Sequence, residues 1–290
     1  EADGVFQGSW MAGFQNSRPA TGTRDEAEGS RGAGDGLWAH VVYISQGDTS
    51  LALASVDNIG IMYDQVVGYR AQVMAAADVD HLLVQATHSH ASPDMMGIYG
   101  PSTTVTGFNQ AYSDQIGAAL VQAVEEASQS AVEVSMEVGA TDATAYHQNG
   151  TANLITDTRD PWIVDPMIQT IRFVNNLDDT VATLVNWANH PETVADENTL
   201  FTSDYAHALR ETVSEGVSWE NTSRAGVGGI TMLVNGTVGG MMTSLRGEVE
   251  DLDGNVWQSA SFHKADAVGQ LAGGMALQSL GSSTVAENPS

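Results

Sequence analysis

Three histidines stand where the sequence predicts the ends of two buried strands. His88 and His90 follow the apolar run 82–86, and His190 follows a second apolar run, 183–189. Imidazole is a common protein ligand of zinc and other transition metals. Alternate residues of an extended chain point to the same side, so a His-x-His pair at a strand end can direct both rings at one ion. Because loops at strand ends often hold ligands in α/β proteins, the pattern predicts a metal site that includes His88 and His190.

Three aspartates near these segments each have two interpretations. Asp57 and Asp94 could accept hydrogen bonds from the histidine rings and orient them, or they could form turns at the start of their loops. Asp204 could reach the metal, or Asp204 or its neighbour Ser203 could cap a helix. For His88 and His190 themselves, a role in capping the strand-end loop stays open beside the ligand role. The remaining histidines are interpreted as ordinary surface or core residues: His40, His81, His147, His207 and His263.

The histidine segments also carry a resemblance to a known family. Residues 86–93, Ala-Thr-His-Ser-His-Ala-Ser-Pro, resemble the Thr-His-Thr-His-Ser-Gly-Pro segment of neutral, non-lysosomal ceramidases, and residues 186–191 resemble that family's second histidine segment. Segments 36–43, 55–60 and 262–280 resemble further family segments in the same order. The resemblance therefore extends over approximately residues 11 to 280 of the chain.

This resemblance implies a zinc-dependent enzyme that hydrolyses an amide or ester bond, with a small-molecule or lipid substrate of the N-acylsphingosine kind. His88 and His190 would be ligands of Zn²⁺. His90 matches the histidine beside the first ligand, which favours a catalytic role in hydrogen bonding the substrate oxygen over a role as third ligand. The family also implies a secreted protein, extracellular or periplasmic, and Glu1 in place of an initiating Met favours a processed form or a fragment.

Two departures from the family pattern qualify the transfer of function. The best match to the family's nucleophile segment, residues 236–243, places Met242 where a serine is expected, and a thioether cannot serve as an acyl-transfer nucleophile. Thr243 or Ser244 could substitute after a short shift. The resemblance implies that the family's remaining metal ligands, a glutamate and a tyrosine, come from sequence beyond the part that corresponds to Leu280. Two alternatives follow: a ceramidase-like protein without catalysis that serves in binding or surface assembly, and a metal-dependent hydrolase of another type.

The composition excludes some partners and suggests a habitat. The 290 residues include 36 acidic and 10 basic side chains, for a formal net charge of −26, and Lys264 is the only lysine. Such a charge repels phosphate backbones, so we expect no nucleic-acid partner. The acidic excess could also indicate a cationic partner, but acidic surfaces stay hydrated and screened at high ionic strength, which favours a marine or halophilic source. Cysteine is absent, which leaves imidazole and carboxylate as metal ligands. No apolar run is long enough to predict a membrane span, and the oligomeric state is not indicated.

Hydrophobic periodicity predicts an α/β fold with a mixed β-sheet core, in one or two sheets, flanked by helices. We expect a single domain over residues 1–290, with residues 1–36 as an extended N-terminal arm. In the helix expected at 63–77, the residues predicted to be buried include Val66, Val67, Val73 and Met74. The expected strands are 40–45, 50–57, 82–86, 132–138, 168–174, 180–189 and 230–234, and the expected helices are 63–77, 109–127, 203–215 and 263–280.

Overall fold

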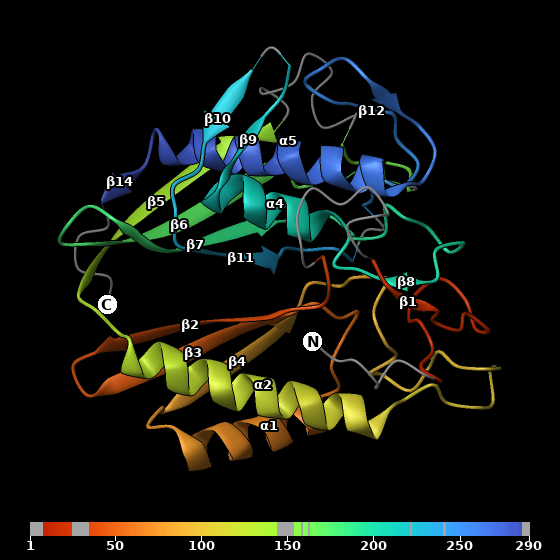
Figure 1. The fold of residues 1–290 in the computed structure, drawn as a ribbon, viewed down its shortest axis with the longest axis horizontal. Helices are drawn as coiled ribbons and strands as arrows, with labels where there is room; N and C mark the ends of the chain where they lie inside the picture. The colour runs from red at the N-terminus through yellow and green to blue at the C-terminus, as the bar shows by residue number, and fades with distance from the viewer. Residues whose placement is uncertain are drawn as a thin grey trace. The chain divides into compact units, whose positions relative to one another are not determined.

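The chain forms two compact units, each with its own sheet and core. The computed structural model describes residues 8–24, 35–143, 154–157, 159–161, 163–220, 222–239 and 242–285. Of the described residues, the first unit contains 8–24, 35–132 and Asp196–Ser203, and the second contains 133–195 and 204–285 (Figure 1). Each unit buries a separate cluster of apolar side chains.

The first unit is built on a three-stranded sheet in the order β2-β3-β4. Strands β2 (Ala39–Gln46) and β3 (Thr49–Val56) form an antiparallel hairpin, as predicted, and β4 (His81–Ala86) pairs parallel to β3. The hairpin turn includes Gly47 at φ 59°, a conformation that glycine adopts without steric cost. Because β3 and β4 are parallel, their carboxyl ends lie at the same edge of the sheet, and the loops after them meet there.

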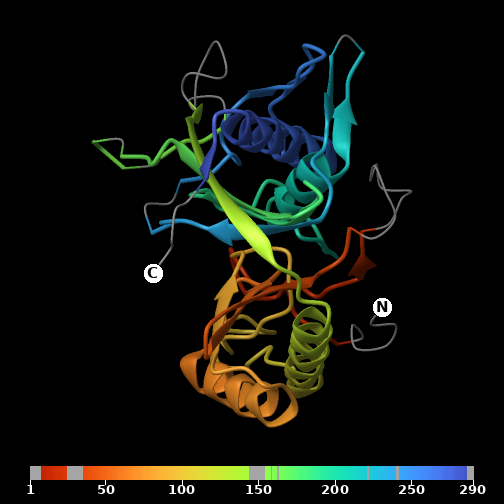
Figure 2. The same cartoon turned by 90° about the vertical axis from the view of Figure 1, so that its left-hand side faces the viewer.

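Two helices, α1 (Tyr63–Ala76) and α2 (Gln110–Gln129), cover one side of this sheet and pack on each other (Figure 2). The α2 helix begins after Asn109, whose side chain accepts hydrogen bonds from two backbone N–H groups of the first turn. Its four-residue apolar spacing produces the buried stripe that the sequence predicts, formed by Ile116, Leu120 and Val124.

The predicted burial is wrong at three positions of the first unit. Val67 and Met74 are 44% and 51% exposed, because α1 buries only the narrow stripe of Tyr69 and Val73, and residues adjacent in sequence point about 100° away around a helix. Leu83, expected in a buried strand, is 49% exposed. It lies on an edge strand, where side chains alternate between the face that carries the helices and the opposite face.

The second unit contains a five-stranded mixed sheet in the order β11-β7-β6-β5-β14. The predicted hairpin is present as β6 and β7, and β11 pairs parallel to β7 while the other neighbours are antiparallel. The strands are β5 (Val134–Asp142), β6 (Met167–Asn175), β7 (Thr180–Trp187), β11 (Ile230–Asn235) and β14 (Thr284–Val285). The parallel pair again places two loops, those after β7 and β11, at one sheet edge.

Helices α4 (Tyr205–Ser214) and α5 (Phe262–Leu280) pack side by side over this sheet (Figure 1). Two glycines of α5 allow the α4 and α5 helices to approach each other closely. A Cβ on Gly269 would lie 2.4 Å from the Tyr205 carbonyl oxygen, and one on Gly273 would lie 2.7 Å from Thr212 Cβ. The α5 helix is accordingly buried along most of its length.

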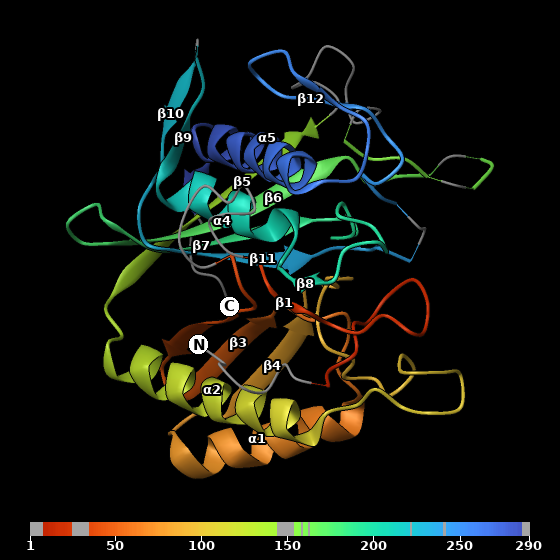
Figure 3. The same cartoon turned by 45° about the vertical axis from the view of Figure 1, so that its right-hand side comes forward.

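Short strand pairs complete the described chain. Figure 3 shows the β9–β10 hairpin beside α4. Of the expected N-terminal arm 1–36, residues 8–24 run as ordered loop with one short strand, and most of the remainder lies outside the described residues. No helix in the described ranges is long and apolar enough to cross a membrane.

The short strand pairs are β1 (Gly22–Thr23) with β8 (Leu200–Phe201), β9 (Gly216–Ser218) with β10 (Ser223–Ala225), and β12 (Val249–Glu250) with β13 (Val256–Trp257).

The predicted fold class is confirmed: mixed sheets with helices packed on them. The expected single domain stays a prediction.

Candidate functional site

The loop that carries His88 is fixed to the end of the neighbouring strand. The His88 backbone N–H donates to the Asn58 carbonyl at 2.8 Å, and the Thr87 N–H donates to the Val56 carbonyl at 3.0 Å. His88 itself adopts φ 70°, a conformation that is unusual for a residue with a side chain. Such backbone strain persists only where the surrounding structure enforces it, and it is concentrated at functional sites. The loop therefore holds the His88 ring in a defined place.

One ring nitrogen of His88 has its role set by a backbone carbonyl. His88 Nδ1 lies 2.6 Å from the Ile59 carbonyl oxygen. A carbonyl oxygen can only accept, so Nδ1 must carry the hydrogen, and in the neutral ring Nε2 then carries the lone pair. Metal-binding histidines use this arrangement, in which the second nitrogen donates to a carbonyl or carboxylate and fixes the ring orientation.

His90 lies beside His88 in the same unit, with ring centroids 5.0 Å apart and the rings nearly perpendicular. On another side its ring contacts Phe14, also at 5.0 Å. Gly13, at φ 86°, allows this close packing, since a Cβ there would lie 2.7 Å from the His90 ring. The structure thus brings His88 and His90 together and holds His90 against the 13–14 turn.

Arg18 organises this region, and sequence reasoning missed it. Its guanidinium is buried and lies over the Phe14 ring, 5.1 Å from the centroid. An arginine next to a proline gives no sequence signal for such a role, because it binds backbone carbonyls and those of His90, Asp196 and Asn198 are distant in the chain. It donates hydrogen bonds to the backbone carbonyls of Ala12, Gly13, His90, Asp196 and Asn198.

Asp57 and Asp94, both in the first unit, have contacts that favour the turn-forming interpretation. Asp94 is buried, and its carboxylate accepts from the N–H groups of Met96, Gly97 and Tyr99, each at 3.0 Å. Asp57 accepts from the Trp38 N–H at 3.1 Å, which joins the two ends of the β2–β3 hairpin. Both carboxylates therefore shape the loops on which the histidines depend.

His190 follows β7 in the second unit and is fixed in the same manner as His88. Its backbone N–H donates to the Met242 carbonyl at 3.1 Å, and its Nδ1 lies 2.7 Å from the same oxygen. Nδ1 must again carry the hydrogen, which leaves the lone pair on Nε2. Burial lowers the pKa of His190, and the hydrogen bond to Met242 opposes that shift. The neutral ring, the form that binds metals, is therefore favoured at neutral pH.

The residues at the expected nucleophile position are buried and have structural contacts. Met242 is 3% exposed and supplies the carbonyl that holds His190. Thr243 Oγ1 accepts from the Leu245 N–H at 3.0 Å. Ser244 is fully buried; its hydroxyl donates to the Leu154 carbonyl and accepts from the Asn189 side chain. These contacts give no support to a nucleophile shifted to Thr243 or Ser244.

Asp204 is the N-cap of α4, which confirms the helix-capping interpretation. Its carboxylate accepts from the Tyr205 N–H at 2.7 Å and from the Val194 N–H at 3.1 Å. Complete burial raises the pKa of Asp204 to about 6, although hydrogen bonds to its carboxylate oppose that shift. The carboxylate ties the loop after His190 to the start of the helix.

The other described histidines lie away from strand-end loops. His207 pairs with Glu211 at 3.3 Å, and His263 stacks on Trp257 with ring centroids 5.0 Å apart. His40 lies beside Trp38, and His81 is exposed at the start of β4. His147 falls outside the described residues.

Comparisons with known proteins agree with the fold. The family model for the N-terminal part of neutral/alkaline non-lysosomal ceramidase matches residues 40–264. The crystal structure of neutral ceramidase from Pseudomonas aeruginosa is similar with a TM-score of 0.73 at 15% identity, over 96% of this chain and 44% of that one. A ceramidase complexed with C2 is similar with a TM-score of 0.71 at 14% identity, over 96% and 43%. No curated protein sequence matches the chain.

These structural matches show a shared fold, and the chain spans less than half the length of the ceramidases it resembles. The family model extends over both histidine segments and over most of the sequence, including the loop that carries Met242. The chain therefore belongs to the neutral/alkaline non-lysosomal ceramidase family and corresponds to its N-terminal part.

Proposed function

We propose that this protein is a zinc-dependent hydrolase of an amide or ester bond, with N-acylsphingosine-type lipids as its substrate class. Family membership supports the reaction class, and the similar structures are of ceramidases. The observation that carries the proposal is that the His88 and His190 rings have the same tautomer. His88 and His190 each donate from Nδ1 to a carbonyl oxygen and so carry the lone pair on Nε2.

The donor set fits a zinc ion. His88 and His190 are the proposed ligands, and imidazole nitrogens are preferred zinc ligands. His90 is assigned to hydrogen bonding the substrate oxygen, with a role as third ligand as the alternative. Each of these three histidines offers one imidazole nitrogen as a ligand atom. A bound zinc ion would supply Lewis-acid polarisation of the scissile carbonyl and activation of water.

The surrounding residues position these rings. Ile59 and Met242 orient His88 and His190 through their carbonyls, while Arg18 fixes the His90 backbone and the turn against which its ring packs. Because Met242 replaces the serine expected from the resemblance, hydrolysis would proceed by direct attack of water rather than through an acyl-enzyme.

A second function, a ceramidase-like protein that binds without catalysis, is favoured by one specific observation. Met242 is buried at the expected nucleophile position, and the hydroxyls of Thr243 and Ser244 have structural partners. This second function predicts lipid binding with no turnover.

Hydrolysis of a fluorescent N-acylsphingosine by the full-length, zinc-loaded protein tests the proposal. We expect release of the acyl chain without a burst phase, and loss of that activity in His88→Ala. His81→Ala is the matched control, since His81 is an exposed histidine on the strand that leads to His88. A His90→Ala variant that keeps its zinc but loses activity would support the substrate-binding role of His90. Absence of turnover in a fully zinc-loaded protein would replace this proposal with the binding function.

A further inference from the structure

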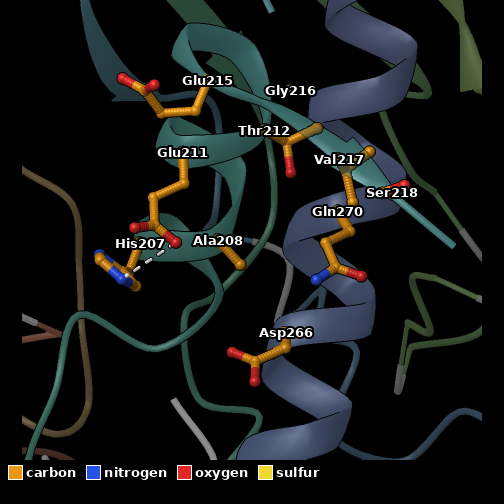
Figure 4. A pocket seen from close by; sticks show the side chains of 10 residues that line it. All are labelled: His207, Ala208, Glu211, Thr212, Glu215, Gly216, Val217, Ser218, Asp266 and Gln270. Atoms are coloured by element: carbon orange, nitrogen blue, oxygen red, sulfur yellow. Dashed lines mark ion pairs between the residues drawn. The ribbon is translucent and has the colours of Figure 1, made fainter. Parts of the chain in front are cut away.

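A cavity of about 370 Å³ lies in the second unit between α4, α5 and the start of β9 (Figure 4). Its volume is within the range of small-molecule sites. Three carboxylates line it, from Glu211, Glu215 and Asp266; the ten lining residues include no Lys or Arg, and the lining His207 pairs with Glu211. The charge of this lining therefore favours a cation and disfavours an anion.

A buried amide with a fixed orientation faces the same cavity. Gln270 is 6% exposed, and its Oε1 accepts a hydrogen bond from Trp219 Nε1 at 3.2 Å. Since Oε1 is held by the indole, the amide nitrogen must point the other way, and Figure 4 shows it turned toward the cavity. Among the described residues this nitrogen has no hydrogen-bond acceptor. It offers two N–H donors that a ligand with an acceptor oxygen would satisfy.

Thr212 adds a hydroxyl on the opposite wall. It is 2% exposed, and its Cβ and methyl face Gly273 of α5, since a Cβ on that glycine would lie 2.7 and 2.8 Å from them. Its hydroxyl consequently turns toward the cavity (Figure 4). Together with Gln270, it gives the cavity hydrogen-bonding groups that a simple acidic surface lacks.

We infer that this cavity is a binding site for a small organic cation that also carries hydroxyl groups, separate from the histidine site. Carboxylates would bind the ammonium group, while Gln270 and Thr212 would bind hydroxyl oxygens. An organic cation is favoured over a metal ion because, within the described chain, the lining carboxylates and His207 do not gather three ligand atoms in reach of one ion.

Glucosamine and glucose are suitable probes because they differ only in the ammonium group. Binding to the full-length protein is measured by isothermal titration and ligand-observed NMR at low salt with EDTA present, so that metal binding at the histidines does not contribute. We expect glucosamine to bind at least about tenfold more tightly than glucose, and we expect added NaCl to weaken it.

Substitutions of the cavity residues test whether glucosamine binds in this cavity. Glu211→Gln with Asp266→Asn should weaken glucosamine binding about tenfold and leave glucose unchanged. The exposed pair Glu133→Gln with Asp48→Asn removes the same two charges elsewhere and should have no effect. Thr212→Val should weaken both sugars. Because Glu215 is exposed, Glu215→Gln should keep the fold and still reduce glucosamine affinity, which covers the case in which the double variant unfolds.

Equal affinity for the two sugars, no glucosamine binding at about 10 mM, or unchanged binding in the cavity variants would each overturn the inference.

Discussion

Lys264, the only lysine of the chain, is fully buried near the start of α5, and its replacement by Met should destabilise the protein strongly. Its ammonium donates to the carbonyl oxygens of Leu245, Gly247 and Gln258 at 2.9, 2.7 and 3.1 Å. The bonds to Leu245 and Gly247 anchor a loop that begins three residues after Met242, whose carbonyl orients His190.

The expected cost follows from these contacts. Hydrogen bonds that involve a charged group contribute about 1.5–3 kcal/mol each. Burial of the ammonium lowers the pKa of Lys264, opposed by the charge of Asp204, and this desolvation cost offsets part of the gain. A methionine fills similar volume and buries apolar surface, but it leaves three carbonyls without a donor. We expect a loss of about 3–5 kcal/mol in the free energy of unfolding.

Urea unfolding followed by tryptophan fluorescence and circular dichroism measures this loss. Arg246→Met is the matched control, because it removes one positive charge from an exposed position in the same loop. That control should change stability by no more than about 0.5 kcal/mol. A Lys264→Met variant as stable as the control would refute the reasoning, since it would mean that the three hydrogen bonds contribute nothing net.

Three further predictions concern pH, salt and the nucleophile. The Asp204 pKa of about 6 lies above its unfolded value of 3.8, so this carboxyl stabilises the fold below pH 4 and that stability is lost as pH rises to about 6. Between pH 4 and 7 the free energy of unfolding should fall by about 3 kcal/mol because of this carboxyl, and Asp204→Asn should remove that fall, measured by urea unfolding. If the variant's free energy of unfolding depends on pH as the wild type's does, the raised pKa of Asp204 is contradicted. The formal charge of −26 predicts a melting temperature that rises with NaCl, and a flat or falling series would remove the inference of salt adaptation. Thr243→Ala should retain most of the hydrolytic rate, because its hydroxyl accepts from the Leu245 N–H; loss of activity with normal zinc content would instead identify a shifted nucleophile.

Local patterning was enough to predict most of the elements. The hairpin at β2 and β3, the hairpin at β6 and β7, and the α2 stripe of Ile116, Leu120 and Val124 were predicted because alternation and four-residue spacing are local signals. Burial depends on which neighbour covers each face. Val67, Met74 and Leu83 look like core residues in sequence, yet the helix and the edge strand on which they lie leave those positions exposed.

The candidate site could also be predicted only in part from the sequence. The two histidine segments were identified because each follows an apolar strand. The hydrogen bonds that orient the His88 and His190 rings could not be predicted, because the Ile59 and Met242 carbonyls are backbone groups that leave no signal in the residue types. Arg18 and Lys264 were missed for a related reason: a buried cation that binds backbone carbonyls is indistinguishable in sequence from a surface charge.

The most direct test of the proposed zinc site is the metal content of the purified full-length protein after dialysis against zinc. We expect one zinc per chain by mass spectrometric metal analysis, with loss of the metal in both His88→Ala and His190→Ala and retention in the His81→Ala control. A wild-type protein without zinc, or zinc content unchanged in either ligand variant, would contradict the claim that these two histidines bind one ion.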